Sequence, residues 1–125
     1  MEMDQFTRLF ESIFIGRMNL KNRIVFPAVG TRFAGITGEA TQLDVDHYSA
    51  RAMGGAGLII IPWVQVDTKL GRKVGRHRID SDEYIRGMHD IIEAVHLNDS
   101  KIAIQLSRSI GKGSLRLIRK AKGIS

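Results

Sequence analysis

The chain has 125 residues, 43% of them apolar, with 19 Lys and Arg against 13 Asp and Glu, a formal net charge of +6 and no cysteine. This composition is typical of a folded domain, and the absence of cysteine excludes disulfides and cysteine-ligated metal clusters. No apolar run reaches the roughly 18 residues that span a bilayer, and the acidic start of the chain is unlike a signal peptide. We therefore expect a soluble, cytoplasmic protein with room for one domain.

The positive charge is concentrated at the C-terminus. Five basic residues and no acidic ones lie in residues 112–125, which leaves the first 111 residues with a net charge of +1. A nucleic-acid-binding protein usually spreads a basic face over its fold. The tail is therefore better interpreted as a solvated terminus. Binding of nucleic acid or an anionic surface through this tail is the alternative.

The first part of the chain predicts a small hairpin, a strand and a helix. Residues Ile13–Leu20 suit a hairpin that turns at Gly16 and Arg17, and Arg23–Val29 is a short run of β-formers that leads into a Gly/Thr loop through Thr41. Residues Leu43–Met53 are helix formers that end at Gly54 and Gly55. The expected N-cap is Thr41 or Asp44, and the expected apolar stripe is Leu43, His47 and Ala50, with Tyr48 beside Ala52.

A second strand and helix follow. The continuous apolar run Gly57–Val64 suits a strand that is buried on both faces. After a polar, basic loop, Asp80 and Glu83 have capping-box spacing, which predicts that the next helix begins there. We expect this helix to end with Asn98 in the left-handed conformation. Its apolar stripe is Tyr84, Met88, Ile91 and Val95.

The last predicted strand, Lys101–Leu106, alternates in polarity. Ile102, Ile104 and Leu106 form one side, which we expect to face the helices, and Lys101, Ala103 and Gln105 form the other. Gln105 near the carboxyl end of this strand is expected to be a buried amide, and such an amide needs hydrogen-bond partners.

This order of elements fits two architectures, an open doubly wound sheet or part of a closed barrel. Gly30, Gly35 and Gly38 lack the spacing of a dinucleotide-binding loop, and a polar residue at the mouth of a barrel suits a ligand site. We therefore expect an α/β fold that is a partial (β/α)₈ barrel, with three strands, two helices and an N-terminal hairpin. A whole barrel needs roughly 250 residues, so we also expect open edges and self-association through them.

The residues predict no metal site and identify no catalytic residue. His89, Glu93 and His96 share a helix face without zinc-site spacing. What remains is the segment Pro27, Ala28, Val29 and Gly30 together with Gln105. The segment offers a flat apolar surface, and the amide offers both a donor and an acceptor, which suits the edge of a planar aromatic ring. A core amide satisfied by protein groups is the alternative interpretation of Gln105.

Several segments resemble one known family. They are Leu9-Phe10-Glu11, Ile15-Gly16, Leu20 to Val25, Pro27-Ala28, His47 to Ala52, Gly54 to Ile59, Gly71-Arg72, Arg78-Ile79-Asp80, Ala94-Val95-His96 and Lys101 to Leu106. In this order they resemble the N-terminal part of the old yellow enzymes, the NADH:flavin oxidoreductases. The resemblance is strongest to the bacterial branch with 2-enoate reductase and 2,4-dienoyl-CoA reductase.

The resemblance implies an FMN-dependent reductase of activated alkenes on a TIM barrel, with NAD(P)H as hydride donor. It places Pro27, Ala28, Val29 and Gly30 against the flavin ring and Gln105 at the pyrimidine edge of the ring. Residues 1–111 would then be the N-terminal half of the FMN-binding barrel and 112–125 a basic tail, and this part alone is expected to be inactive.

Two positions depart from the family pattern. Trp63 stands where the family usually has a small residue near the flavin, and Arg108 stands where a His is typical. The family's substrate ligands, proton donor and phosphate loops lie beyond the matched segments, so no catalytic residue is carried over.

Overall fold

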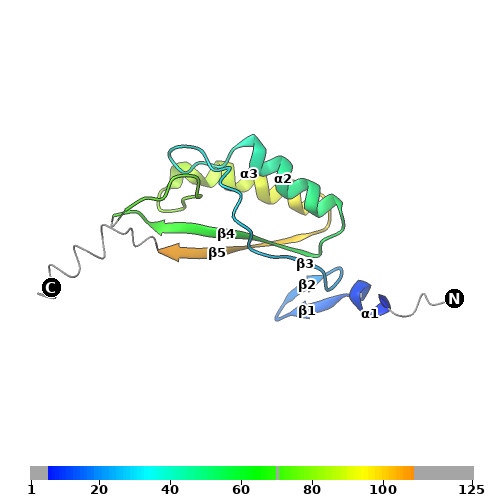
Figure 1. The fold of residues 1–125 in the computed structure, drawn as a ribbon. Helices are drawn as coiled ribbons and strands as arrows, with labels where there is room; N and C mark the ends of the chain where they lie inside the picture. The colour runs from blue at the N-terminus through cyan, green and yellow to red at the C-terminus, as the bar shows by residue number, and fades with distance from the viewer. Residues whose placement is uncertain (1–5, 70, 109–125) are drawn as a thin grey trace, which may run out of the picture.

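The computed structural model describes residues 6–69 and 71–108. Figure 1 shows a short N-terminal helix and hairpin, followed by strands and helices that alternate along the chain. The elements are α1 (Thr7–Phe10), β1 (Ile13–Ile15), β2 (Met18–Leu20), β3 (Val25–Phe26), α2 (Gln42–Met53), β4 (Leu58–Asp67), the 3₁₀ turn η2 (Asp82–Tyr84), α3 (Ile85–His96) and β5 (Lys101–Arg108). The expected order of hairpin, strand, helix, strand, helix and strand is confirmed. The predicted basic tail lies outside the described residues.

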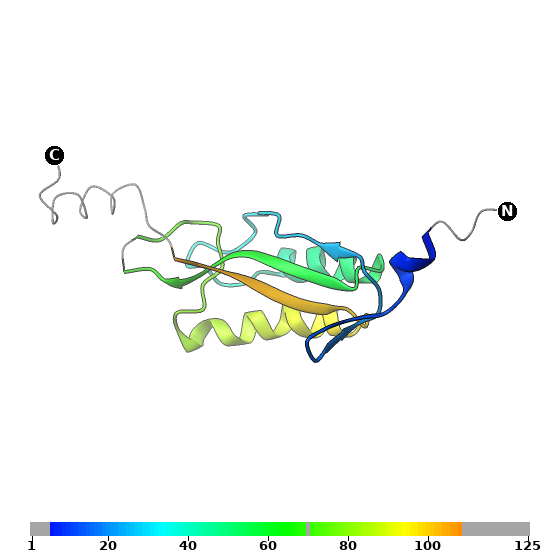
Figure 2. The same ribbon diagram turned by 90° about the horizontal axis from the view of Figure 1, so that it is seen from below.

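The central sheet is parallel, with strand order β3-β4-β5. Both α2 and α3 cover one face of it, and the β1-β2 hairpin lies at the end where the strands begin (Figures 1 and 2). The core fills the space between that face and the helices, and it consists of Tyr48, Ala52, Ala56, Ile59, Ile61, Val64, Met88, Ile91 and Val95. No described helix is long and apolar enough to cross a membrane.

Strand β3 is shorter than predicted. The sequence suggested a strand over Arg23–Val29, but only Val25 and Phe26 pair with β4, opposite Leu58 and Ile59. Pro27 lacks a backbone N–H, so it cannot continue the ladder. The segment from Pro27 to Gly30 is therefore a loop from its first residue.

The buried face of α2 differs from the predicted stripe. Thr41 is the N-cap, as one of the two alternatives stated, but Leu43 is 60% exposed and the fully buried positions are Asp44, Tyr48 and Ala52. A buried aspartate was not predicted because a carboxylate at the third helical position is normally a solvated cap. Gly55 has a φ of +101°, as expected for the residue that ends this helix.

Helix α3 begins later than predicted and ends differently. Asp80 does not cap it; the first turn is the 3₁₀ segment from Asp82, and the Asp80 carboxylate is bound by Arg78 instead. Asp99, not Asn98, has the left-handed φ of +53°, while the Asn98 side chain donates a hydrogen bond to the carbonyl of Ala94. The predicted stripe of Tyr84, Met88, Ile91 and Val95 is buried.

Strand β4 contains a bulge at Pro62 and Trp63. Ile61 pairs with Ile104 and Val64 with Leu106, so β4 has one residue more than β5 over this stretch. The bulge returns Val64 to the helix-facing core. The two bulge residues, Pro62 and Trp63, lie directly opposite Gln105.

Strand β5 is an edge strand in the described part of the chain, and its burial differs from the prediction. Ile102 packs against the core, but Ile104 is 40% and Leu106 61% exposed. Gln105 is exposed and not buried as predicted. Ile104 and Leu106 are on the helix side of the sheet, but no described strand pairs with the outer edge of β5 beside them. Gln105 alternates with them and so lies on the opposite face, which neither α2 nor α3 covers.

Candidate functional site

The loops that follow β3 and β4 lie together at the carboxyl ends of the parallel strands. In Figure 1 they are gathered near the arrowheads of β4 and β5. A backbone hydrogen bond from Arg78 N to Gly38 O, 3.0 Å long, joins them. In parallel α/β folds this edge of the sheet is where ligands bind.

Trp63 connects two of the predicted ring-contact positions. Its backbone N–H donates to the Gln105 Oε1 atom at 3.3 Å. Its indole lies so close to Gly30 that a Cβ atom built on Gly30 would be 2.5 Å from Trp63 Cζ3. The Arg76 guanidinium carbon lies 4.4 Å from the centre of the indole. Gly30 and Gln105, which are distant in sequence, thus contact the same residue.

The other predicted ring-contact positions line the start of this loop. Pro27 and Val29 are exposed, and Ala28 is half-buried. Pro27, Ala28 and Val29 precede Gly30 in the loop and make no hydrogen bond to Trp63 or Gln105 among the described residues. The structure therefore brings Gly30 and Gln105 to a common neighbour, Trp63.

The residues present fit a flavin ring only in part. The exposed amide of Gln105 suits a ring edge that both donates and accepts hydrogen bonds. The surface over Gly30 does not suit the ring as it stands, because the Trp63 indole already covers it.

The buried amide of the site is Gln65, which the sequence analysis missed. Gln65 is fully buried; its Nε2 donates to the carbonyls of Lys73 (3.2 Å) and Arg76 (3.4 Å), and its Oε1 accepts from Lys73 N at 3.0 Å. These bonds hold the loop after β4, which carries Arg76 toward Trp63. The sequence signal that could have indicated this buried amide is a single polar residue between the two apolar residues Val64 and Val66.

Arg78 fastens the two loops to each other. Its Nε and Nη2 bind both carboxylate oxygens of Asp80 at 2.8 and 2.9 Å, and its Nη1 donates to the Thr37 carbonyl at 3.2 Å. The Tyr84 ring lies below the guanidinium, and its hydroxyl also donates to Thr37 O. The hydrogen bonds from Arg78 hold the pKa of Asp80 below its ordinary value.

A second polar group lies beneath the loops. Asp44 and His77 are both buried, with Asp44 Oδ1 3.1 Å from His77 Nε2. Although burial opposes it, the nearby imidazole and the hydrogen bonds from Thr41 hold the pKa of Asp44 below its ordinary value. Burial, and then the Asp44 charge, raise the pKa of the adjacent Tyr48 to about 12. Burial also lowers the pKa of His47. The contact between Asp44 and His77 holds the loop after β4 against α2.

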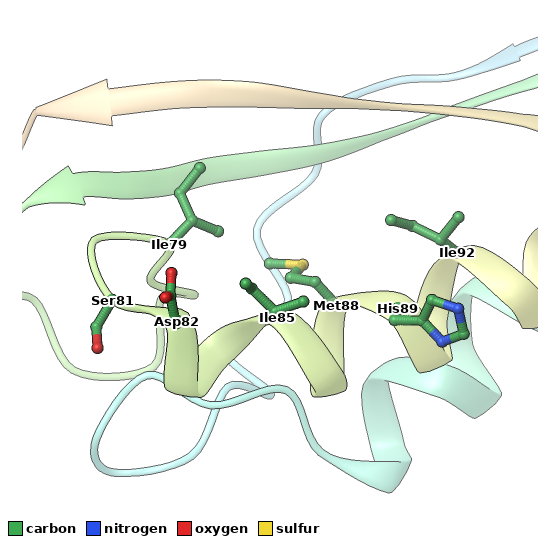
Figure 3. A pocket seen from close by; sticks show the side chains of 7 residues that line it. All are labelled: Ile79, Ser81, Asp82, Ile85, Met88, His89 and Ile92. Atoms are coloured by element: carbon green, nitrogen blue, oxygen red, sulfur yellow. The ribbon is translucent and has the colours of Figure 1, made fainter.

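An apolar cleft of about 380 Å³ lies elsewhere, along α3. Figure 3 shows the side chains that line it, contributed by α3 and the segment before it: Ile79, Ser81, Asp82, Ile85, Met88, His89 and Ile92. It shares no residue with Gly30, Trp63 and Gln105, so it is a separate feature.

Comparison with known proteins decides the family. Residues 8–117 match the profile of the NADH:flavin oxidoreductase / NADH oxidase family. The chain belongs to this family. It is 42% identical over 105 residues to an NADH oxidase of Thermoanaerobacter brockii, covering 83% of this chain and 16% of the relative. It is 38% identical over 110 residues to an NADPH dehydrogenase of Bacillus subtilis, covering 86% of this chain and 32% of the relative.

The solved structures agree. The crystal structure of Old Yellow Enzyme from Pichia sp. AKU4542 superposes with a TM-score of 0.77 and 29% identity, covering 94% of this chain and 30% of that one. The predicted membership of the NADH:flavin oxidoreductases and the partial TIM-barrel fold are thereby confirmed. FMN as cofactor and NAD(P)H as hydride donor are what the matched family and the named relatives imply. The chain spans less than a third of each of these relatives.

Proposed function

We propose that this chain supplies the part of an FMN site that receives the flavin ring, within an NAD(P)H-dependent reductase of activated alkenes. The observation that carries the proposal is the meeting of Gly30 and Gln105 at Trp63, at the carboxyl ends of parallel strands. The alkene class rests on the sequence resemblance to the 2-enoate and 2,4-dienoyl-CoA reductases.

The chain by itself is proposed to bind flavin weakly and to turn over no substrate. It spans 16% to 32% of the relatives compared above, so most of the protein surface that surrounds a cofactor in a whole barrel is not provided by these residues. A purified chain is therefore expected to be colourless. A visible spectrum showing one flavin per chain would contradict this part of the proposal.

The ring site is tested by nuclear magnetic resonance on the ¹⁵N-labelled chain, titrated with lumiflavin, which is the flavin ring without ribityl phosphate. We expect shifts at the Gly30 amide and the Gln105 side-chain amide, and none at the buried amide of Gln65. FMN is expected to bind no more tightly than lumiflavin, because the proposal assigns no phosphate contact to this chain.

A substitution then assigns the contact. Gln105→Leu is expected to weaken lumiflavin binding about tenfold, as the loss of a hydrogen-bonded edge of about 1.4 kcal/mol implies. The matched control is Gln42→Leu, which removes an exposed glutamine of α2 that bonds Asp46. If Gln105→Leu and Gln42→Leu bind lumiflavin equally well, Gln105 is not the ring contact and the proposed site is wrong.

A further inference from the structure

Trp63 has an unusual backbone for a large side chain. Its φ is +50°, in the left-handed region that favours glycine, and it lies in the bulge of β4 opposite Gln105. Trp63 is 41% exposed. Strained positions of this kind persist where surrounding contacts hold them, and they are concentrated at functional sites.

The contacts of Trp63 coincide with those predicted for the flavin. The indole lies on Gly30, the backbone N–H binds the Gln105 oxygen, and Arg76 stacks on the ring 4.4 Å from its centre. The indole is itself a flat aromatic ring. It therefore covers the surface that a flavin ring would use.

We propose that Trp63 controls access to the ring site, by covering Gly30 until a flavin displaces the indole. This inference rests on the proposed function. Displacement requires the indole to leave Arg76 and Gly30, so only the fraction of molecules with the indole moved aside is competent to bind. The apparent affinity is reduced by that fraction.

The experiment uses the fact that the chain contains one tryptophan. Its indole N–H gives a single resonance, which is expected to shift as lumiflavin is added. Trp63→Gly removes the ring and suits the left-handed backbone, so it is expected to bind lumiflavin about tenfold more tightly, as for a site open in one molecule in ten. Trp63→Phe keeps an aromatic ring over Gly30 and is expected to bind like the unchanged chain.

A second variant tests the same proposal in case Trp63→Gly does not fold. Arg76→Ala removes the stacking partner of the indole and leaves Gly30, Trp63 and Gln105 in place, so it is expected to strengthen lumiflavin binding two- to threefold.

The outcomes separate the two proposals. If Trp63→Gly and Arg76→Ala bind lumiflavin no more tightly than the unchanged chain, the access role of Trp63 is wrong, while the effect of Gln105→Leu still decides the ring site. If the unchanged chain and every variant fail to bind lumiflavin, the ring site itself is wrong and the inference fails with it.

Discussion

Asp44 shows how a single charged side chain can be accommodated in the core. Its Oδ2 accepts from the backbone N–H and the hydroxyl of Thr41, at 2.9 and 3.1 Å, and its Oδ1 lies against His77. One carboxylate therefore caps α2 and holds the loop after β4. A buried charge is tolerated only when it is partnered in this way.

Replacing this carboxylate should destabilise the protein. Asp44→Asn is expected to lower the free energy of unfolding by about 3 kcal/mol at pH 7, because it removes a buried carboxylate that accepts two hydrogen bonds from Thr41 and lies against His77. The pKa of Asp44 lies below its ordinary value of 3.8. Its stabilising contribution is therefore present above about pH 4 and is lost as the pH falls through the lowered pKa. Urea unfolding at pH 7 and pH 3 measures both effects.

Asp46→Asn is the control for this substitution. Asp46 is exposed on the same helix and is bound by Gln42, so its replacement should change the free energy of unfolding by less than about 0.5 kcal/mol. If Asp44→Asn and the unchanged chain differ in the free energy of unfolding by the same amount at pH 3 as at pH 7, the charge of Asp44 is not what stabilises the protein.

Residue types alone identified one polar group of the site, Gln105, but not its environment. Gln105 was predicted to be buried and is exposed, whereas Gln65, buried and bonded three times, was missed. The difference arises from the bulge at Trp63 and from the returning loop, and neither leaves a periodic signal in the sequence. Burial at these positions is decided by tertiary contacts.

At the scale of elements, the periodicity of apolar residues predicted the buried face of a helix where that face consists of apolar side chains only. The stripe on α3 was correct because four apolar side chains at helical spacing must face the sheet. The stripe on α2 was wrong because its buried face includes Asp44, which hydropathy places outside. The ends of elements were also displaced, since Pro27 stops β3 and Arg78 binds the Asp80 expected to cap α3.

The Gln65 side chain holds the part of the loop after β4 that contains Lys73 and Arg76, and this is testable. Gln65→Leu leaves the amide and carbonyl of Lys73 and the carbonyl of Arg76 without their partner, which should cost about 2 kcal/mol of stability. The Lys73 amide should exchange its hydrogen faster in the variant, while amides of α2 should change only through global stability. Unchanged exchange at Lys73 would contradict this role, and Gln42→Leu is again the control.

At the scale of the whole molecule, α2 and α3 cover one face of the sheet, and no described strand pairs with the outer edges of β3 and β5. Among the described residues no strand pairs with the outer edge of β5, beside which Ile104 and Leu106 are exposed, or with the outer edge of β3, where Val25 is 42% exposed. Unpaired strand edges with apolar side chains are templates for pairing with another chain. These open edges were predicted from the sequence, because three strands of a barrel were inferred in a chain about half as long as a whole barrel.

We propose that two copies of the chain associate through these edges. Sedimentation equilibrium is expected to give a mass that rises with concentration, and Leu106→Lys should shift it toward the monomer because an edge lysine opposes pairing. Leu97→Lys is the control, since Leu97 is 85% exposed just after α3. A monomer at every concentration would rule out the association.

The brace made by Arg78 has an evolutionary consequence. It links Thr37 and Gly38 to Asp80 through contacts internal to the first two strand–helix units, so its geometry is independent of whatever lies beyond β5. If the segment from β3 to β5 were exchanged between members of the family, the loops after β3 and β4 would be transferred together. The recipient would receive these two loops already joined to each other by the contacts of Arg78.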